Sequence, residues 1–255
     1  MYMKKLLSFT ATILSLGLVP AFAQFGPRAG GPHFGGAMDR LFGKNQSFST
    51  VVVFQMDGAN GDKTSMTGKM SFDTGKTRFE MNMSEMQGSK MPPGAAQQMK
   101  AMGMDAMITI SRPDLKLTYL VYPGLNSYAE MPSQDSSGSV SPDDYKVETT
   151  ELGKESVDGH DCVKNKVTVT DKEGVKHEST VWNASDLKDF PVKIVTNEGG
   201  TSVTMRYQNT AFVKPAASLF EAPADFTKYD SVQTMMQTEM MKKMGGGAAL
   251  PPAQH

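Results

Sequence analysis

Apolar and polar side chains alternate with a period of two residues along most of this chain, and this pattern restricts the fold more than any other feature of the sequence. Between residues 48 and 56, Phe48, Val52 and Phe54 share one parity, and Ser49 and Gln55 share the other. Successive side chains of a β-strand point to opposite faces of the sheet. The alternation therefore predicts a strand with one buried and one solvated face.

The same pattern recurs and predicts about eleven strands. They are expected at 48–56, 66–72, 79–83, 106–111, 117–122, 127–131, 145–152, 162–170, 177–182, 192–196 and 202–212. Turn sequences such as Asp73-Thr74-Gly75 and Asp158-Gly159 separate neighbouring segments. Helices are expected only at 95–102, after Pro92-Pro93-Gly94, and at 231–244. The chain is predicted to be mainly β, with antiparallel strand pairs.

The first 23 residues have the three parts of a secretory signal peptide. Lys4 and Lys5 precede an apolar run from Leu6 to Val19, and small residues end at Ala23. The apolar run is short for a bilayer span, which favours cleavage after Ala23 over a retained anchor. We therefore expect a periplasmic or secreted protein without stable membrane insertion.

The remaining sequence divides into three further regions. Residues 24–45 are rich in Gly and Pro and are expected to form a flexible lead-in, with a helical turn at 37–42. The β-domain is assigned to 46–230, and the aromatic pair around Pro223 is expected to clip its end onto the sheet. Residues 231–255 are expected to be a Met-rich helix followed by a disordered tail.

Composition excludes several classes of function. Cys162 is the single cysteine, so no intrachain disulfide can form and stability must come from an apolar core. Without Lys4 and Lys5, 24 basic residues face 27 acidic ones, a net charge of −3, which argues against nucleic-acid binding. Methionine, with 21 residues, is unusually frequent, and Trp occurs once.

The order of several short motifs resembles a known family. The first blocks are Ile108-Thr-Ile-Ser-Arg-Pro-Asp114, Val121-Tyr-Pro123 and Ser127-Tyr-Ala-Glu-Met-Pro132. The later blocks are 153–162, 181–187 with 191–193, and Leu219-Phe220 with Pro223. Together they cover about residues 48–229, and they resemble a family of exported bacterial proteins described as a domain of unknown function, which is similar to the LolA/LolB lipoprotein-carrier superfamily.

This resemblance implies a strongly curved, half-open antiparallel sheet with a few short helices covering its concave face. In the carriers of the superfamily, that concave face holds the acyl chains of a lipoprotein. The present chain differs from them in its Gly-rich lead-in and in the many methionines at the positions that would line the cavity.

The sequence gives little support for a catalytic site. His160 and Cys162 stand two residues apart, but the side chains at i and i+2 of a strand diverge from a shared substrate, and the sequence offers no orienting partner. A group of carboxylates is expected to lie on a solvated strand and loop, without an apolar pocket that would shift a pKa; it comprises Glu148, Glu151, Glu155, Asp158 and Asp161. We expect no enzymatic activity and no cofactor.

The methionines give a clearer indication of a binding site than the candidate catalytic residues do. Met is a flexible apolar residue suited to surfaces that adapt to varied ligands, and many methionines fall on the apolar parity of their strands. The predicted lining of a ligand cavity is Phe54, Met66, Met70, Phe72, Phe79, Met81, Met83, Met99, Met102, Met236 and Met240. The alternative is a copper site at Met81, Met83, Met86 and Met91, because soft thioethers select Cu(I).

Two functions remain open from the sequence. The first is a non-enzymatic binding or carrier protein for an apolar ligand, such as a lipid or the acyl chains of a lipoprotein. The second is a Met-rich protein that binds or buffers copper. The sequence identifies no protein partner.

Overall fold

The computed structural model describes residues 36–59, 61–88, 94–133, 145–170, 174–198, 200–243 and 245. The predicted signal peptide, most of the lead-in, residues 134–144, Met91 and the predicted C-terminal tail lie outside these ranges. None of the helices in the described part of the chain has the length and apolarity needed to cross a bilayer.

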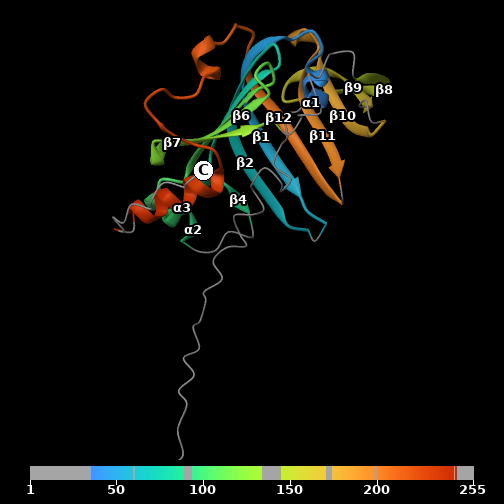
Figure 1. Ribbon diagram of the computed structural model, residues 1–255. Coiled ribbons are helices and arrows are strands. Elements are labelled where there is room, and N and C mark those ends of the chain that lie inside the picture. The colour runs from blue at the N-terminus through green and yellow to red at the C-terminus, as the bar shows by residue number, and fades with distance from the viewer. Residues whose placement is uncertain are drawn as a thin grey trace, which may run out of the picture. The chain divides into compact units, whose positions relative to one another are not determined.

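Within the described residues, the domain consists of thirteen strands and a few short helical segments (Figure 1). The strands are β1 (Ser47–Asp57), β2 (Lys63–Asp73), β3 (Lys76–Asn82), β4 (Gln87–Gly88), β5 (Ala106–Arg112), β6 (Leu117–Tyr122), β7 (Ser127–Pro132), β8 (Lys146–Val157), β9 (His160–Thr170), β10 (Lys176–Ala184), β11 (Phe190–Glu198), β12 (Thr201–Ala211) and β13 (Thr227–Tyr229). The helices are α1 (Gly36–Asp39), α2 (Ala95–Met102) and α3 (Val232–Lys243), with 3-10 turns η2 (Arg40–Phe42), η3 (Met83–Glu85), η4 (Pro123–Leu125), η6 (Ser185–Leu187) and η7 (Ala217–Phe220).

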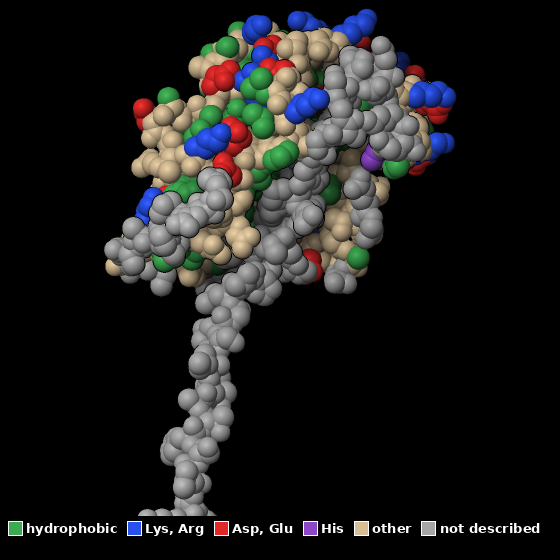
Figure 2. All heavy atoms as spheres, in the orientation of Figure 1, with side chains coloured by type: hydrophobic (Ala, Val, Ile, Leu, Met, Phe, Trp, Pro, Cys, Tyr) green, Lys and Arg blue, Asp and Glu red, His purple; other side chains and the backbone are tan. Residues whose placement is uncertain are grey.

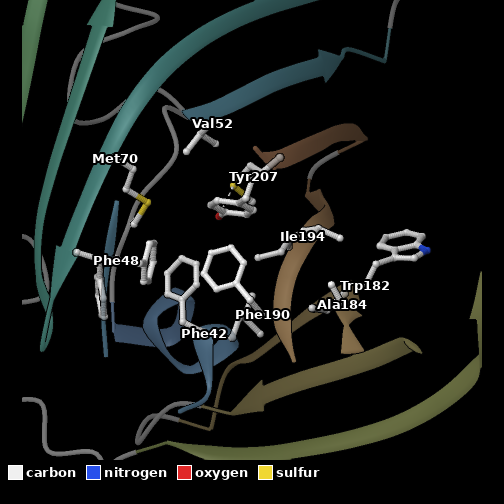
Figure 3. Packing of buried hydrophobic residues seen from close by; sticks show 14 of the residues in the cluster. Phe42, Phe48, Val52, Met70, Trp182, Ala184, Phe190, Ile194 and Tyr207 are labelled. Carbon is white, nitrogen blue, oxygen red and sulfur yellow. Dashed lines mark hydrogen bonds between the residues drawn. The ribbon is translucent and has the colours of Figure 1, made fainter. Parts of the chain in front are cut away.

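All strands belong to one open sheet. Its order is β13-β7-β6-β5-β3-β2-β1-β12-β11-β10-β9-β8, and β4 pairs beside β2. Every pair is antiparallel except β13 with β7, which is parallel. β13 and β8 are the two edges, and Figure 3 shows strands from both halves curving around a shared aromatic cluster. The predicted fold class, a curved open antiparallel sheet with few helices, is confirmed.

The predicted alternation places one set of side chains on a buried face. In β1, Phe48, Val52 and Phe54 are buried, whereas Gln55 and Asp57 are exposed. We call the face that carries these buried residues the apolar face. Two-residue turns with positive φ, such as Thr74-Gly75, join consecutive strands tightly and match the right-handed twist of the hairpin.

The centre of the apolar face is filled by aromatic rings (Figure 3). Phe42 from η2 lies 4.9 Å from Phe48, 5.4 Å from Phe72 and 5.7 Å from Tyr207, measured between ring centroids. Its ring stacks on Phe190 of β11 at 6.0 Å. The end of the predicted lead-in is thus an integral part of the core, because Phe42 joins strands from both halves of the sheet.

The opposite face of β5 and β6 is covered by the chain that follows β12. Phe220 is fully buried against Ile110 and Tyr119. Arg112 donates to the Phe220 carbonyl at 3.2 Å and to the Glu221 carboxylate at 2.7 Å. The predicted clip around Pro223 therefore forms, and it attaches through both apolar contact and the buried guanidinium of Arg112.

Three local features differ from the strand prediction. β4 and β13 contain only two and three residues, too few for an alternating pattern to be visible. Met83, expected to continue the strand from Met81, instead begins η3. There the Asn82 side chain accepts a hydrogen bond from the Ser84 amide at 3.0 Å, which caps the turn and ends the strand.

Candidate functional site: the covered apolar face

The sheet brings together six of the predicted cavity residues. Phe54, Met66, Met70, Phe72 and Phe79 are buried in one cluster, and Met81 packs against it half-buried. The register explains this grouping: Phe54 lies opposite Met66, Met70 opposite Phe79, and Gly68 opposite Met81. Side chains directly opposite on neighbouring strands are close neighbours on the same face. The apolar face of β1, β2 and β3 is therefore a continuous surface of aromatic rings and thioethers.

Gly68 allows one of these rings to lie over the sheet. A Cβ at this position would stand 2.3 Å from Cζ of Phe79 and 2.7 Å from the Glu80 carbonyl oxygen. Without it, the Phe79 ring crosses the backbone of β2 and meets Phe54 edge-on at 5.2 Å. The glycine in the middle of a strand is thus required by close packing of the apolar face.

Two short helical segments cover the apolar face beyond β3. Met83 of η3 and Met99 of α2 are buried, and Met102 at the end of α2 is half-buried. α2 contacts η3, and its C-cap Gly103 lies so close to Gly124 of η4 that a Cβ there would be 2.4 Å from the Gly124 oxygen. Met99 is the only side chain of α2 that is buried.

α3 is a further cover of the apolar face, and it lies beside α2 (Figure 1). It contacts β7 and β13, and Met235 is its one fully buried apolar side chain. Met236 is half-buried, whereas Met240 is 41% exposed. Of the predicted helical lining residues, the structure places Met236 near the covered side and Met240 toward solvent.

A buried carboxylate fastens α3 to the sheet. Glu239 accepts hydrogen bonds from Ser127 Oγ at 3.2 Å, from the Tyr229 hydroxyl at 2.6 Å and from Lys242 Nζ at 2.8 Å. Burial alone would raise the pKa of Glu239, but the donors Lys242, Tyr229 and Ser127 together hold it below its ordinary value. The carboxylate is therefore ionised at neutral pH, and α3 depends on that charge.

The floor below these covers is strongly apolar. Tyr122 at the end of β6 donates its hydroxyl to the sulfur of Met107 at 3.5 Å, a weak acceptor. Burial raises the pKa of Tyr122 to about 12. A phenol whose hydroxyl is bonded to a thioether indicates a dry environment between β5, β6 and the helical covers.

The family assignment rests on a sequence match. A family model described as Domain of unknown function (DUF4412) matches residues 51–190, which is more than half of the chain. The chain belongs to the DUF4412 family. The prediction of such a family from the order of short motifs is confirmed. A search of curated protein sequences finds no match to this chain.

Solved structures with similarity to this DUF4412 chain include three bacterial proteins. A LolA superfamily protein from Nitrosomonas europaea has a TM-score of 0.39 at 10% identity, covering 73% of this chain and 94% of its own. The lipoprotein LppX from Mycobacterium tuberculosis has a TM-score of 0.37 at 12% identity, covering 68% and 88% respectively. LprF from Mycobacterium bovis has a TM-score of 0.36 at 14% identity, covering 71% and 95%.

The residues considered for catalysis are engaged elsewhere. The His160 imidazole pairs with Asp186 at 2.8 Å, and the Cys162 thiol donates to the His160 carbonyl at 3.3 Å. Burial raises the pKa of Cys162, the opposite of the change that activates a thiol. Of the carboxylates, Glu148 pairs with Lys146 at 2.7 Å on the exposed strand β8.

Within the described ranges, no three His, Cys, Asp or Glu side chains gather in a way that could hold a metal ion. Methionine thioethers, the ligands of the alternative copper site, are not among these four residue types. Of the alternative copper ligands, Met81 and Met86 pack half-buried against the core cluster, Met83 is buried in η3, and Met91 lies outside the described residues.

The predicted cavity lining leaves out three buried residues that hold the covers in place, which are Phe42, Met235 and Glu239. Phe42 stands in a Gly- and Pro-rich segment, and Met235 and Glu239 stand in a helix whose polar and apolar residues are mixed on all sides. The spacing of Met235 and Glu239, four residues apart on one helix face, was the available signal.

Proposed function

We propose that this DUF4412 protein is an exported, non-enzymatic carrier that holds an acyl chain against the apolar face of its sheet. The observation that carries the proposal is the thinness of the covers. η2 buries Leu41 and Phe42, α2 buries Met99, and α3 buries Met235 and Glu239. A broad apolar face is thus closed by short segments that each bury one or two side chains.

The energetics favour exchange of a cover for a ligand. Burial of one Met side chain stabilises by about 1.5–3 kcal/mol, which is the apolar share of α3 docking. An acyl chain that buries about ten methylenes gains on the order of 8 kcal/mol before the entropy of association is subtracted. The gross gain from a ligand of this size therefore exceeds the apolar share of α3 docking.

The methionines suit such exchange. Their unbranched side chains have three rotatable bonds and adjust to a cover or to a guest without a fixed shape. The lining that we propose comprises Met81, Met83, Met99, Met102 and Met236, with the aromatic floor of Phe54 and Phe79 behind them. Phe42 stays in place, because its ring packs among several others.

Export belongs to the proposal. The basic, apolar and small-residue regions of the first 23 residues support it. N-terminal sequencing of protein recovered from the periplasm of the expression host is expected to begin at Gln24. An intact Met1 in the cytoplasmic fraction would remove this part of the proposal.

Acyl-chain binding is tested directly with the delipidated mature protein. We expect saturable uptake of a fluorescent polyene fatty acid at one molecule per chain, with competition from a triacylated lipopeptide. Native mass spectrometry of protein isolated gently from the periplasm is expected to show a bound lipid mass. Ligand-free protein that also takes up neither probe would contradict the proposal.

A photoreactive fatty acid tests the position of the guest. Peptide mass spectrometry is expected to place the adducts in η3, α2 and α3, around Met83, Met99 and Met236. Adducts confined to the opposite face, around Tyr119, would contradict the proposed site even if uptake is saturable. Met241 is exposed and lies outside the proposed lining. Met241→Ala is therefore a control that is expected to leave fatty acid uptake unchanged.

A further inference from the structure

Four side chains from four adjacent strands form a row across the face of the sheet opposite the aromatic cluster. Arg206 of β12 lies opposite Lys193 of β11, Lys193 opposite Trp182 of β10, and Trp182 opposite Lys164 of β9. We call these four residues the Lys193 row. Figure 3 shows Trp182 directed away from the aromatic rings, and Ile194, the neighbour of Lys193 in sequence, is buried among them.

Trp182 is a fixed platform for two of the cations. Its indole is 5% exposed, and its Nε1 donates to the Glu155 carboxylate. Lys193 Nζ lies 4.1 Å from the ring centroid and Lys164 Nζ lies 5.0 Å from it. Two ammonium groups thus lie within cation–π distance of one indole, an arrangement that stabilises each cation but brings like charges together.

The charges of this region do not balance. Arg206 pairs with Asp158 at 2.7 Å, and Lys164 pairs with Glu155 at 3.6 Å. No described carboxylate lies within ion-pair distance of the Lys193 ammonium, whose contact is the indole ring. Three cations therefore face two carboxylates, and the excess is one positive charge centred on Lys193.

The excess positive charge lowers the stability of the sheet. Like charges directly opposite on neighbouring strands destabilise a sheet, and Lys193 stands opposite Arg206. Burial and the charges of Arg206 and Lys164 lower the pKa of Lys193, and the charges of Glu155 and Asp158 only partly oppose them. Packing of the apolar face on the other side of the sheet does not require these cations, since Ile194 and Met205 supply that contact.

We propose that the Lys193 row binds a monoanionic phosphate group, which supplies the missing negative charge beside Lys193. The side chains of Arg206 and Lys164 are each about one third exposed, at 34% and 33%, so a phosphate oxygen can reach them from solvent. Arg206, Lys193 and Lys164 stand in this row on β12, β11 and β9 and offer charge-assisted hydrogen bonds to such a group. The site lies on the face opposite the proposed acyl site and does not depend on it.

The single Trp of the chain reports on this site directly, because Trp182 is its platform. Two ligands distinguish the source of the phosphate: inorganic phosphate, and monomeric dihexanoyl phosphatidylglycerol. Dihexanoyl phosphatidylcholine serves as the net-neutral control. The readouts are Trp182 fluorescence and equilibrium dialysis of the folded mature protein.

We expect a saturable, salt-sensitive change with phosphatidylglycerol or with phosphate, and none with phosphatidylcholine. Binding of both anions, or of phosphate alone, indicates a general phosphate site, and binding of phosphatidylglycerol alone indicates a lipid headgroup site; each result supports the proposal. Absence of binding by both anions in dialysis and in fluorescence overturns it.

Variants locate the binding. Lys193→Met keeps the aliphatic cover of the indole and removes the charge, and it is expected to weaken binding by roughly tenfold or more, as the loss of a charged hydrogen bond implies. Arg206→Gln is expected to weaken it in the same direction. Lys188→Met is the matched control, because Lys188 stacks on the Phe212 ring at 5.1 Å in the same way. Equal affinity of Lys193→Met and wild type would overturn the assignment.

Discussion

η2 and α3 cover the same apolar face, but they are attached in different ways. η2 inserts Phe42 among the rings of Phe48, Phe72, Phe190 and Tyr207, which come from strands on both sides of the sheet centre. α3 buries one apolar side chain and is otherwise fastened by an ionised carboxylate.

This difference separates a core element from a removable one. Aromatic contacts around Phe42 form within a close-packed interior, and they are lost only when the sheet itself opens. The contacts of α3 are local, so the helix can detach while the strands remain paired, and local openings of this kind occupy the low end of the stability range. The comparison predicts that η2 determines global stability and that α3 determines access to the apolar face.

The largest expected effect is that of Phe42→Ala. Removal of a buried aromatic ring from a well-packed core lowers the free energy of unfolding by about 3–5 kcal/mol. Urea unfolding followed by circular dichroism measures this loss. Val213→Ala, at a side chain 72% exposed, is the control and is expected to change stability by less than about 0.5 kcal/mol. A loss below about 1 kcal/mol for Phe42→Ala would mean that η2 is also a loosely held cover.

A smaller and local effect is expected for Met235→Ala. Truncation of a buried Met costs about 2 kcal/mol or more, and here the cost falls on the docking of α3. Amide hydrogen exchange in residues 232–243 is expected to accelerate while β1 and β12 keep their protection. Met241→Ala, at a side chain 42% exposed, should leave exchange unchanged. Equal acceleration in β1 would show that α3 and the sheet open together.

The smallest effect concerns the charge of Glu239. Because its pKa in the folded state lies below the ordinary value of 4.5, ionised Glu239 stabilises α3 at and above that pH, and the contribution is lost as the pH falls through the folded value. Glu239→Gln is expected to weaken α3 docking by about 1–2 kcal/mol at neutral pH and to flatten the acid dependence.

The measurement for Glu239 is the rate of fluorescent fatty acid uptake across a pH series from neutral to acid. Wild-type uptake should become faster as the pH falls, and Glu239→Gln should be fast throughout. Lys228 and Glu130 form an exposed ion pair at 2.7 Å, so Glu130→Gln is a matched control that should keep the wild-type profile. An unchanged profile in Glu239→Gln would remove the role of this carboxylate in holding the cover.

Much of the sheet and the two longer helices, α2 and α3, could be predicted from local sequence, whereas β13 and the attachment of η2 could not. Segments such as 106–111 and 117–122 alternate clearly, and β5 and β6 occupy those positions. β13 was missed because three residues show no period, and its parallel pairing with β7 joins segments about one hundred residues apart. Phe42 was missed because a single buried ring in a Gly-rich segment has no neighbours that repeat its pattern.

The arrangement of the Lys193 row also could not be predicted from local sequence. Lys193 and Arg206 fall within two of the predicted strands, at 192–196 and 202–212. Only the register of β11 and β12 places them opposite each other and beside Trp182. A shift of one residue in either pairing would separate the charges, and the sequence alone does not specify that register.

The sequence by itself determined the strands, their buried sides and the family, because the pleat of a β-strand converts a period of two in hydrophobicity directly into two faces. The tertiary structure alone decided that β12 pairs with β1, which joins the two halves of the sheet, and that η2 inserts Phe42 into the core between them. These contacts link residues far apart in the chain. They depend on packing and charge pairing between segments, and no local pattern encodes such pairing.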